Sequence, residues 1–303
     1  MAIPDPAPSD QISSLRGWFL AARPATLPAA VVPVLVGMAL AVAGRHFHPL
    51  VFLATLACSL MIQIGANLAN DYYDFRKGAD TAERLGPTRV TQSGIFAPRQ
   101  VLLATGYVFS AALILGAYLV WVGGAPIVAI GLFSILCAIG YTGGPFPLGY
   151  HGLGDLFVFI FFGVIAVTGS FYLQTGMVSF HALLASVPVG LLCTNLLVVN
   201  NLRDIDTDRA AGKRTVAVRI GRAASRKQYM LFQLISFTMP LTLWQLGASW
   251  DYTFWLPLIT VPRAVKLSLF VFRNQDRALN KALKGTAELH MRFGLLFALS
   301  LLR

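Results

Sequence analysis

The residues of this chain most suited to chemistry are its few acids. Asp and Glu number 13 in 303 residues, and seven of them fall in two short segments, Asp71 to Glu83 and Asp204 to Asp208. Each segment ends a long apolar stretch, where a carboxylate costs about 2.5 to 3.5 kcal/mol at a bilayer centre and less toward its edge. We therefore expect a bound partner to compensate these charges, and a divalent cation is the natural one.

Each acidic segment places an Asn four residues before an Asp. At 100° per residue, the first Asn and the acids that follow it fall within about 40° of one helix face, and the second set falls within about 80°. The first face consists of Asn67, Asp71 and Asp74, and the second consists of Asn200, Asp204 and Asp208. Asp206 is predicted to point to the opposite side. The spacing thus predicts two oxygen-rich helix faces.

These faces have the ligand chemistry of a magnesium and phosphate site. Mg²⁺ takes oxygen ligands and is typically held by one or two carboxylates together with substrate phosphates. Basic side chains, which pair with phosphate oxygens, follow both faces: Arg76, Lys77, Arg84, Arg89, Arg209, Lys213 and Arg214. We expect two or three Mg²⁺ ions to bridge a diphosphate. Surface ion pairs at solvated helix ends are the alternative, but they leave the repeated Asn-to-Asp spacing unexplained. Individual bases could equally set the topology or contact anionic lipid.

The elements that must position these faces are apolar. Hydrophobic residues make up 56% of the chain, charged residues make up 12%, and the mean hydropathy is +0.66, which excludes an ordinary soluble domain. Stretches long enough to cross a hydrocarbon core of about 30 Å occur near 25–43, 50–70, 101–122, 125–142, 153–173, 181–201, 228–247, 252–272 and 287–302. We predict an all-α polytopic membrane protein with about nine transmembrane helices.

The net charge of +11 is distributed unevenly along the chain. If nine helices alternate in direction, 19 of the 24 Lys and Arg lie on one side, whereas the loops of the other side carry only Arg45. This excess predicts that the basic side is cytoplasmic, and both acidic segments lie on it. We therefore predict an integral protein of the inner cell membrane, in contact with lipid, whose active site faces the cytoplasm. Because topology explains the charge, nucleic acid is not an expected partner.

One integral domain with a short tail is expected. Residues 1–15 are rich in Pro, Ser and Asp and predict a disordered tail, without a small-residue site for signal-peptide cleavage. Within 16–303, the two acidic faces recur about 133 residues apart, which predicts parallel pseudo-repeats at 16–142 and 153–272 followed by a last helix. Such repeats would bring the faces together across a central cavity. The connections after the faces exceed the lengths usual in helix bundles.

Three segments resemble the UbiA superfamily of intramembrane aromatic prenyltransferases. The segments are Gln63 to Gly94, Tyr141 to Asp155 and Asn200 to Gly221. They contain two Asp-rich motifs, NLANDYYD and NNLRDIDTD, and are similar to the branch that prenylates 1,4-dihydroxy-2-naphthoate in menaquinone biosynthesis. One departure is Gly78, which stands where many members carry an Asp four residues after Asp74.

The resemblance implies a fold, a reaction and a set of site residues. The fold would place nine transmembrane helices around a central cavity, with a cytoplasmic cap formed by the two long loops. Mg²⁺ would be held by Asn67, Asp71, Asp74, Asp204 and Asp208, of which the four aspartates are the expected catalytic residues. Contacts to polyprenyl diphosphate, or to the cation that it forms, are expected from Lys77, Arg84, Arg89, Tyr141 and Lys213. The reaction would join the polyprenyl group to 1,4-dihydroxy-2-naphthoate with loss of diphosphate and CO₂, giving a demethylmenaquinol.

Other functions fit parts of the same pattern. Within the superfamily the acceptor could instead be 4-hydroxybenzoate, homogentisate or a chlorophyllide, and nothing in charge or periodicity identifies the ring. An ion-coupled transporter is the rival from another class, because buried carboxylates and repeats also mark carriers. The position of the acids at helix ends, before long basic loops, disfavours a carrier. Release of diphosphate in the presence of Mg²⁺ would distinguish the enzyme from it.

Overall fold

The protein is built almost entirely of helices. The computed structural model describes residues 14–79, 85–247 and 252–302. Helix accounts for 82% of the described residues, and there is no strand among them. The predicted all-α fold is therefore confirmed. Most of the predicted tail lies outside the described residues, and the first helix begins at Ser14.

Prolines begin several helices of the N-terminal half. The elements are α1 Ser14–Ala22, η1 Pro24–Thr26, α2 Pro28–Ala43, α3 Pro49–Arg76, α4 Pro98–Gly123 and α5 Ala125–Gly140. Proline stands at the start of α2, α3 and α4, where its missing N–H costs no helical hydrogen bond. A bend of 51° separates α2 from the preceding α1 and η1. This bend brings the N-terminal segment over the end of α3, which α1 contacts.

The C-terminal half contains two irregular helical segments. Its first elements are η2 Leu148–His151, α6 Gly154–Val158, the π-helical stretch η3 Phe159–Ile165, α7 Ala166–Thr175, α8 Phe180–Arg203 and α9 Ile205–Ala210. The remaining elements are α10 Val216–Gln245, η4 Tyr252–Thr260, α11 Val261–Arg273, η5 Asp276–Ala278 and α12 Leu279–Ser300. The residues of α6, η3 and α7 form one continuous helical segment, Gly154–Thr175. Gly221 interrupts α10 with a φ of 79°, a conformation that favours glycine.

Helix covers each of the nine stretches that the sequence predicted to cross the membrane. Among the described residues, five helical segments are long and apolar enough for a span: α3, α4, Gly154–Thr175, α8 and Thr253–Arg273. The bent pair of α1–η1 and α2 makes a sixth candidate, and α5 is a shorter apolar helix. These segments support an integral membrane protein, whereas the count of nine and the cytoplasmic cap stay predictions.

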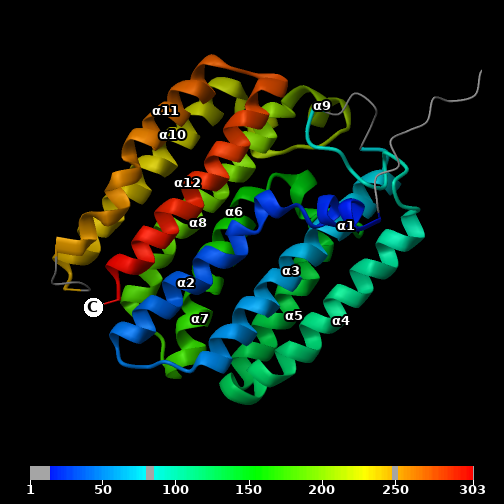
Figure 1. Ribbon diagram of the computed structural model, residues 1–303. Helices are drawn as coiled ribbons and strands as arrows, with labels where there is room; N and C mark the ends of the chain where they lie inside the picture. The colour runs from blue at the N-terminus through cyan, green and yellow to red at the C-terminus, as the bar shows by residue number, and fades with distance from the viewer. Residues whose placement is uncertain (1–13, 80–84, 248–251, 303) are drawn as a thin grey trace, which may run out of the picture.

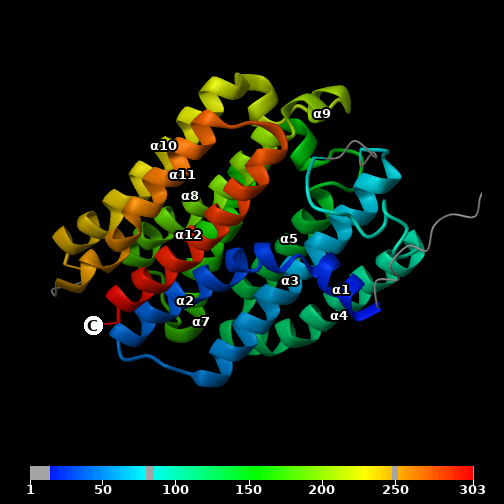
Figure 2. The same ribbon diagram turned by 45° about the horizontal axis from the view of Figure 1, so that its top comes forward.

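The helices form two groups with a shared middle. Figure 1 shows α3 beside α4 and α5, and α8 beside α10 and α12, with α2 and α7 between the two groups. The turned view in Figure 2 shows the same arrangement, with α9 and the loop after α3 at one end of the bundle. Both acidic segments therefore lie at that end.

Close helix packing fixes the middle of the bundle. A buried apolar cluster that includes Val32, Val189 and Phe293 joins α2, α8 and α12. Gly163 of η3 faces Gly190 of α8, where an added Cβ would come within 2.7 Å of the opposite Cα. Such small residues allow the backbones to approach closely, as in other membrane helix pairs. The position of α8 relative to the N-terminal helices is thereby set by packing.

A long cavity of about 760 Å³ connects the acidic end of the bundle with an apolar interior. Residues of α3 line it from Thr55 to Asp74, which corresponds to a rise of about 28 Å at 1.5 Å per residue. Leu119, Ile127 and Leu173 line its far end and pack against one another near the start of α3. The cavity is therefore polar at its mouth and apolar in its depth.

Candidate active site

The two predicted oxygen-rich faces lie across the mouth of this cavity, except that Asp71 of the first face does not line it. Asn67 and Asp74 of α3 line the cavity together with Asp204 and Asp208, which follow α8. The side chain of Lys213 lies between the faces, with its Nζ 3.5 Å from Asp74 Oδ1 and 4.0 Å from Asp208 Oδ1. A single cation thus reaches a carboxylate from each face.

Asp74 is held by side chains from three other segments. Its Oδ1 accepts a hydrogen bond from the Tyr150 hydroxyl at 2.8 Å, and its Oδ2 accepts one from Arg89 Nη2 at 3.1 Å. Lys213 adds the ion pair to Oδ1. Because Asp74 is only 3% exposed, solvent screens these interactions little. The carboxylate therefore ties α3 to three segments that are distant in the sequence.

Asp71 faces the loop that follows α3. Its Oδ2 accepts a hydrogen bond from the backbone N–H of Val90 at 3.1 Å, and its Oδ1 accepts one from the N–H of Thr91 at 3.0 Å. Arg23 Nη2 lies 4.0 Å from Oδ2. Asp71 is fully buried. In this structure it fixes the loop that carries Arg89 beside the cavity mouth.

Arg203 holds Asp204 through a bidentate ion pair between neighbours in the sequence. Its Nε donates to Asp204 Oδ1 at 2.8 Å, and its Nη2 donates to Asp204 Oδ2 at 2.6 Å. The same guanidinium donates to the Oδ1 atoms of Asn200 and Asn280, each at 2.8 Å. Arg203 is buried, and the pair is organised by α8 itself and by α12.

Asp208 at the mouth has a raised pKa. Burial raises its pKa to about 7; Lys213 opposes this shift, and the carboxylates of Asp204 and Asp74 add to it. A divalent cation at this carboxylate would favour the ionised form. Metal binding at Asp208 would therefore lower this pKa.

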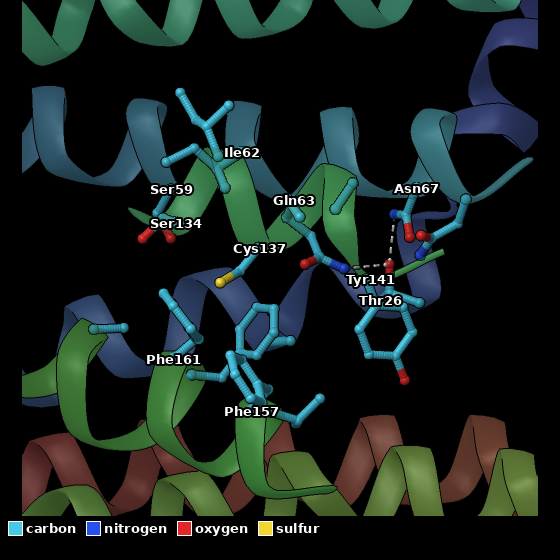
Figure 3. A pocket seen from close by; sticks show the side chains of 18 of the residues that line it. Thr26, Ser59, Ile62, Gln63, Asn67, Ser134, Cys137, Tyr141, Phe157 and Phe161 are labelled. Atoms are coloured by element: carbon cyan, nitrogen blue, oxygen red, sulfur yellow. Dashed lines mark hydrogen bonds between the residues drawn. The ribbon is translucent and has the colours of Figure 1, made fainter. Parts of the chain in front are cut away.

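Asn67 is oriented by the bend between α1 and α2. Its Nδ2 donates to the carbonyl of Ala22 and to Thr26 Oγ1, both at 2.9 Å. Figure 3 shows Thr26 receiving dashed bonds from Asn67 and from Gln63, one helical turn deeper on α3. With its nitrogen held by these two acceptors, the Oδ1 of Asn67 is left to act as a ligand.

The remaining predicted site residues differ in their distance from the mouth. Arg89 and Tyr141 line the cavity, and Figure 3 shows Tyr141 near Thr26 and Asn67. Lys77 lies at the edge, where its Nζ donates to the carbonyl of Gly144 at 3.4 Å. Arg84 lies outside the described residues. Asp206 is exposed and pairs with Arg222 at 2.6 Å, in keeping with its predicted orientation away from the other acids.

Sequence reasoning missed the roles of three residues at the mouth. Tyr150 bonds Asp74 and lies under the Lys213 ammonium, 4.6 Å from its ring centroid. Its position in the third resembling segment was a signal that it belongs to the site. Arg203 directly precedes Asp204, which was a weaker signal. Thr26 is more than 40 residues from Asn67, and no spacing rule connects them.

The donor set fits a hard divalent cation. The groups at the mouth are carboxylate and amide oxygens, which suit Mg²⁺ rather than a softer metal. No three acidic, His or Cys side chains in the described part of the chain are close enough to form a complete metal site. This incomplete set fits Mg²⁺, which keeps several waters and binds through one or two carboxylates together with substrate phosphates.

Comparison with known proteins decides the family. Residues 30–296 match the UbiA prenyltransferase family. The chain belongs to this family. It is 37% identical to 1,4-dihydroxy-2-naphthoate octaprenyltransferase of Escherichia coli strain K12, with 96% of both chains covered. It is 33% identical to the enzyme of the same name from Bacillus subtilis strain 168, with 94% of this chain and 91% of that one covered. The predicted membrane-bound aromatic prenyltransferase is thereby confirmed.

Solved UbiA structures share the fold of this family member. A UbiA homolog from Aeropyrum pernix K1 superposes with a TM-score of 0.69 at 14% identity, covering 90% of this chain and 95% of that chain. A UbiA homolog from Archaeoglobus fulgidus, bound to GPP and Mg²⁺, superposes with a TM-score of 0.64 at 12% identity, covering 93% and 99%. At such low identities the likeness establishes the fold.

Proposed function

We propose that this UbiA family member transfers a polyprenyl group from polyprenyl diphosphate to 1,4-dihydroxy-2-naphthoate, with Mg²⁺ as cofactor and with loss of diphosphate and CO₂. The observation that carries the proposal is the opening of one deep apolar cavity between two acidic faces. The names of the Escherichia coli and Bacillus subtilis relatives support the acceptor. The homolog solved with GPP and Mg²⁺ supports the donor class and the metal.

The proposed metal ligands come from both faces: Asn67, Asp71, Asp74, Asp204 and Asp208. Two or three Mg²⁺ ions, when bound, would neutralise the diphosphate and stabilise it as a leaving group. Arg89 and Lys213 lie beside Asp74 and would add positive charge at the same place. Lys77 and Arg84 are proposed as outer contacts to the diphosphate.

The apolar depth of the cavity suits a reaction that passes through an allylic cation, which the charges at the mouth would help to form. The C–O bond between the allylic carbon and the diphosphate breaks, and its electron pair leaves with the diphosphate. The ring carbon that bears the carboxylate then bonds to the allylic cation, and cleavage of the C–CO₂ bond returns an electron pair to the ring. Apolar side chains such as Phe157 and Phe161 line the cavity and exclude water. Tyr141 is placed to shield the cation by a cation–π contact.

The proposal includes a location for the protein. The helices support an integral membrane protein, and the excess of Lys and Arg on the side of the acidic segments favours the cytoplasmic face of the inner membrane for the cavity mouth. The apolar end of the cavity would then point into the bilayer, where a long isoprenoid tail is stable.

A product assay tests this function directly. Detergent-solubilised protein is incubated with 1,4-dihydroxy-2-naphthoate and a long prenyl diphosphate, with Mg²⁺ or with EDTA, and the products are identified by mass. We expect a prenylated, decarboxylated product and free diphosphate with Mg²⁺, and neither with EDTA. If the naphthoate stays unprenylated in the presence of Mg²⁺ and 4-hydroxybenzoate or homogentisate is prenylated, the proposed acceptor is wrong. The ring that is prenylated is then the acceptor. Absence of diphosphate release with every acceptor would contradict the enzyme assignment of this chain.

A further inference from the structure

Gln63 carries an oxygen inside the cavity that the proposed metal site does not use. It lies four residues before Asn67 on α3, so its side chain is one turn, about 6 Å, deeper in the cavity. Gln63 is only 8% exposed, and among the described residues its Oε1 has no hydrogen-bond partner. A buried acceptor without a partner is unfavourable unless a ligand or a water molecule supplies a donor.

Thr26 fixes the direction in which this oxygen points. The Thr26 hydroxyl donates its only proton to the carbonyl of Arg23 at 2.9 Å, so its oxygen can only accept from other groups. Gln63 must therefore present its Nε2, which donates to Thr26 Oγ1 at 3.1 Å. The amide oxygen is turned away from Thr26, as Figure 3 shows.

The Thr26 hydroxyl orients the side-chain amides of both Gln63 and Asn67. Asn67 also donates to Thr26 Oγ1, and its nitrogen is held independently by the carbonyl of Ala22. The two side chains thus present two carbonyl oxygens one turn apart, Asn67 Oδ1 near the acids and Gln63 Oε1 below it. Asn67 is suited to a metal ion, whereas Gln63 lies where the cavity lining becomes apolar, with Ile62, Phe157 and Phe161 nearby.

The geometry points to Gln63 as a binding residue for the aromatic acceptor: its Oε1 accepts a hydrogen bond from a ring hydroxyl. This inference rests on the proposed function, because it needs a hydroxylated ring below the diphosphate. The placement agrees with the reaction, since the ring must lie deeper than the leaving group and beside the allylic carbon. A hydrogen bond donated by the hydroxyl also leaves more electron density on the ring, which favours attack on the cation. Thr26 is then a positioning residue for both substrates.

Steady-state kinetics with Gln63→Met test the inference, because Met has nearly the same length and lacks the amide. We expect the KM for the naphthoate acceptor to rise about tenfold, the typical effect of one lost hydrogen bond. The KM for the prenyl diphosphate and the Mg²⁺ concentration for half-maximal rate should stay within twofold. A rise in the Mg²⁺ requirement instead would make Gln63 a metal ligand and overturn the inference, as would an unchanged acceptor KM in an active variant.

Two acceptor analogues, each lacking one ring hydroxyl, identify the contact. Each is measured as a competitive inhibitor of wild type and of Gln63→Met. We expect one analogue to bind both proteins equally, because it lacks the hydroxyl that Gln63 contacts, and the other to bind the variant about tenfold more weakly. Equal weakening for both analogues would show a change in cavity shape and would overturn the inference.

Variants of Thr26 separate positioning from packing. Thr26→Ser keeps the accepting hydroxyl and should retain the wild-type acceptor KM and Mg²⁺ requirement. Thr26→Val keeps the shape, releases both amides, and should raise both quantities. If Thr26→Val raises neither, Thr26 does not orient the amides. Failure of wild type to prenylate the naphthoate would instead refute the proposed function, so the two failures are distinguishable.

Discussion

The two acidic faces of the cavity mouth are built in different ways. On the first face, Asp71 and Asp74 are bonded by groups far away in the sequence, including the backbone of residues 90–91 and the Tyr150 hydroxyl. On the second face, Asp204 is bonded by its own neighbour Arg203. The first face therefore depends on completed long-range packing, whereas the second is organised largely within one segment.

The difference assigns different tasks to residues that look equivalent in the two motifs. Asp71 and Asp204 are both tied to protein groups, one to the backbone of a loop and one to a guanidinium. Asp74 and Asp208 share the Lys213 ammonium across the mouth. We infer that Asp74 and Asp208 are the pair closest to the chemistry, and that Asp71 and Asp204 also hold the site in shape.

The largest effect is expected when this shared pair is removed. Asp74→Ala and Asp208→Ala should each lower prenyl transfer at least about 100-fold, because each removes charge from the diphosphate site. Product formation is measured by mass in membranes with matched protein levels. Asp206→Ala is the matched control, since Asp206 is exposed and pairs with Arg222; it should retain activity within about twofold. Full activity of either Asp74→Ala or Asp208→Ala would contradict the assignment.

Removing the local partner of the second face should have the next largest effect. Arg203→Ala leaves the Asp204 carboxylate without its bidentate partner, and breaking a buried ion pair costs about 3 to 5 kcal/mol. The unfolding temperature in detergent should fall, together with activity. Arg203→Lys retains the charge without the planar fork, so an intermediate unfolding temperature is expected. An unfolding temperature of Arg203→Ala equal to wild type would show that this pair does not organise the second face.

On the first face, Asp71→Asn should loosen the loop that Asp71 bonds. An amide cannot accept both backbone hydrogen bonds from Val90 and Thr91, and the loss of one costs about 2 kcal/mol. The loop that carries Arg89 should then be cut faster by trypsin, as measured by limited proteolysis and mass spectrometry. Asp208→Asn is the control, because Asp208 pairs with a lysine rather than with that loop. Equal cleavage of Asp71→Asn and wild type would argue against this role.

The smallest effect is expected from Tyr150→Phe. This change deletes the 2.8 Å hydrogen bond to Asp74 but keeps the ring beneath Lys213. We expect about a tenfold lower kcat/KM for the prenyl diphosphate, because one hydrogen bond to a charged group is lost. Tyr150→Leu also deletes the ring and should lower kcat/KM further. Equal kinetics of wild type and Tyr150→Phe would show that Arg89 and Lys213 suffice to hold Asp74.

Much of the geometry of the candidate site could be predicted from the sequence because it rests on local periodicity. The positions of Asn67 and Asp74 on one helix face follow from 3.6 residues per turn, and hydropathy located a helix at every predicted stretch. Periodicity also predicted that Asp206 points elsewhere. Periodicity did not predict that the Asp71 side chain bonds the backbone of a loop, because this contact depends on where the loop packs.

The amino-acid sequence by itself determined the helices, the two acidic faces and the family, because helix periodicity, apolar length and motif spacing are properties of short segments. Only the tertiary structure decided which groups share a cavity: Lys213 with Asp74 and Asp208, and Thr26 with Asn67 and Gln63. These partners lie 37 to 139 residues from the α3 residues that they bond. Contacts at such separations are fixed by how complete helices pack against one another, which no local pattern encodes.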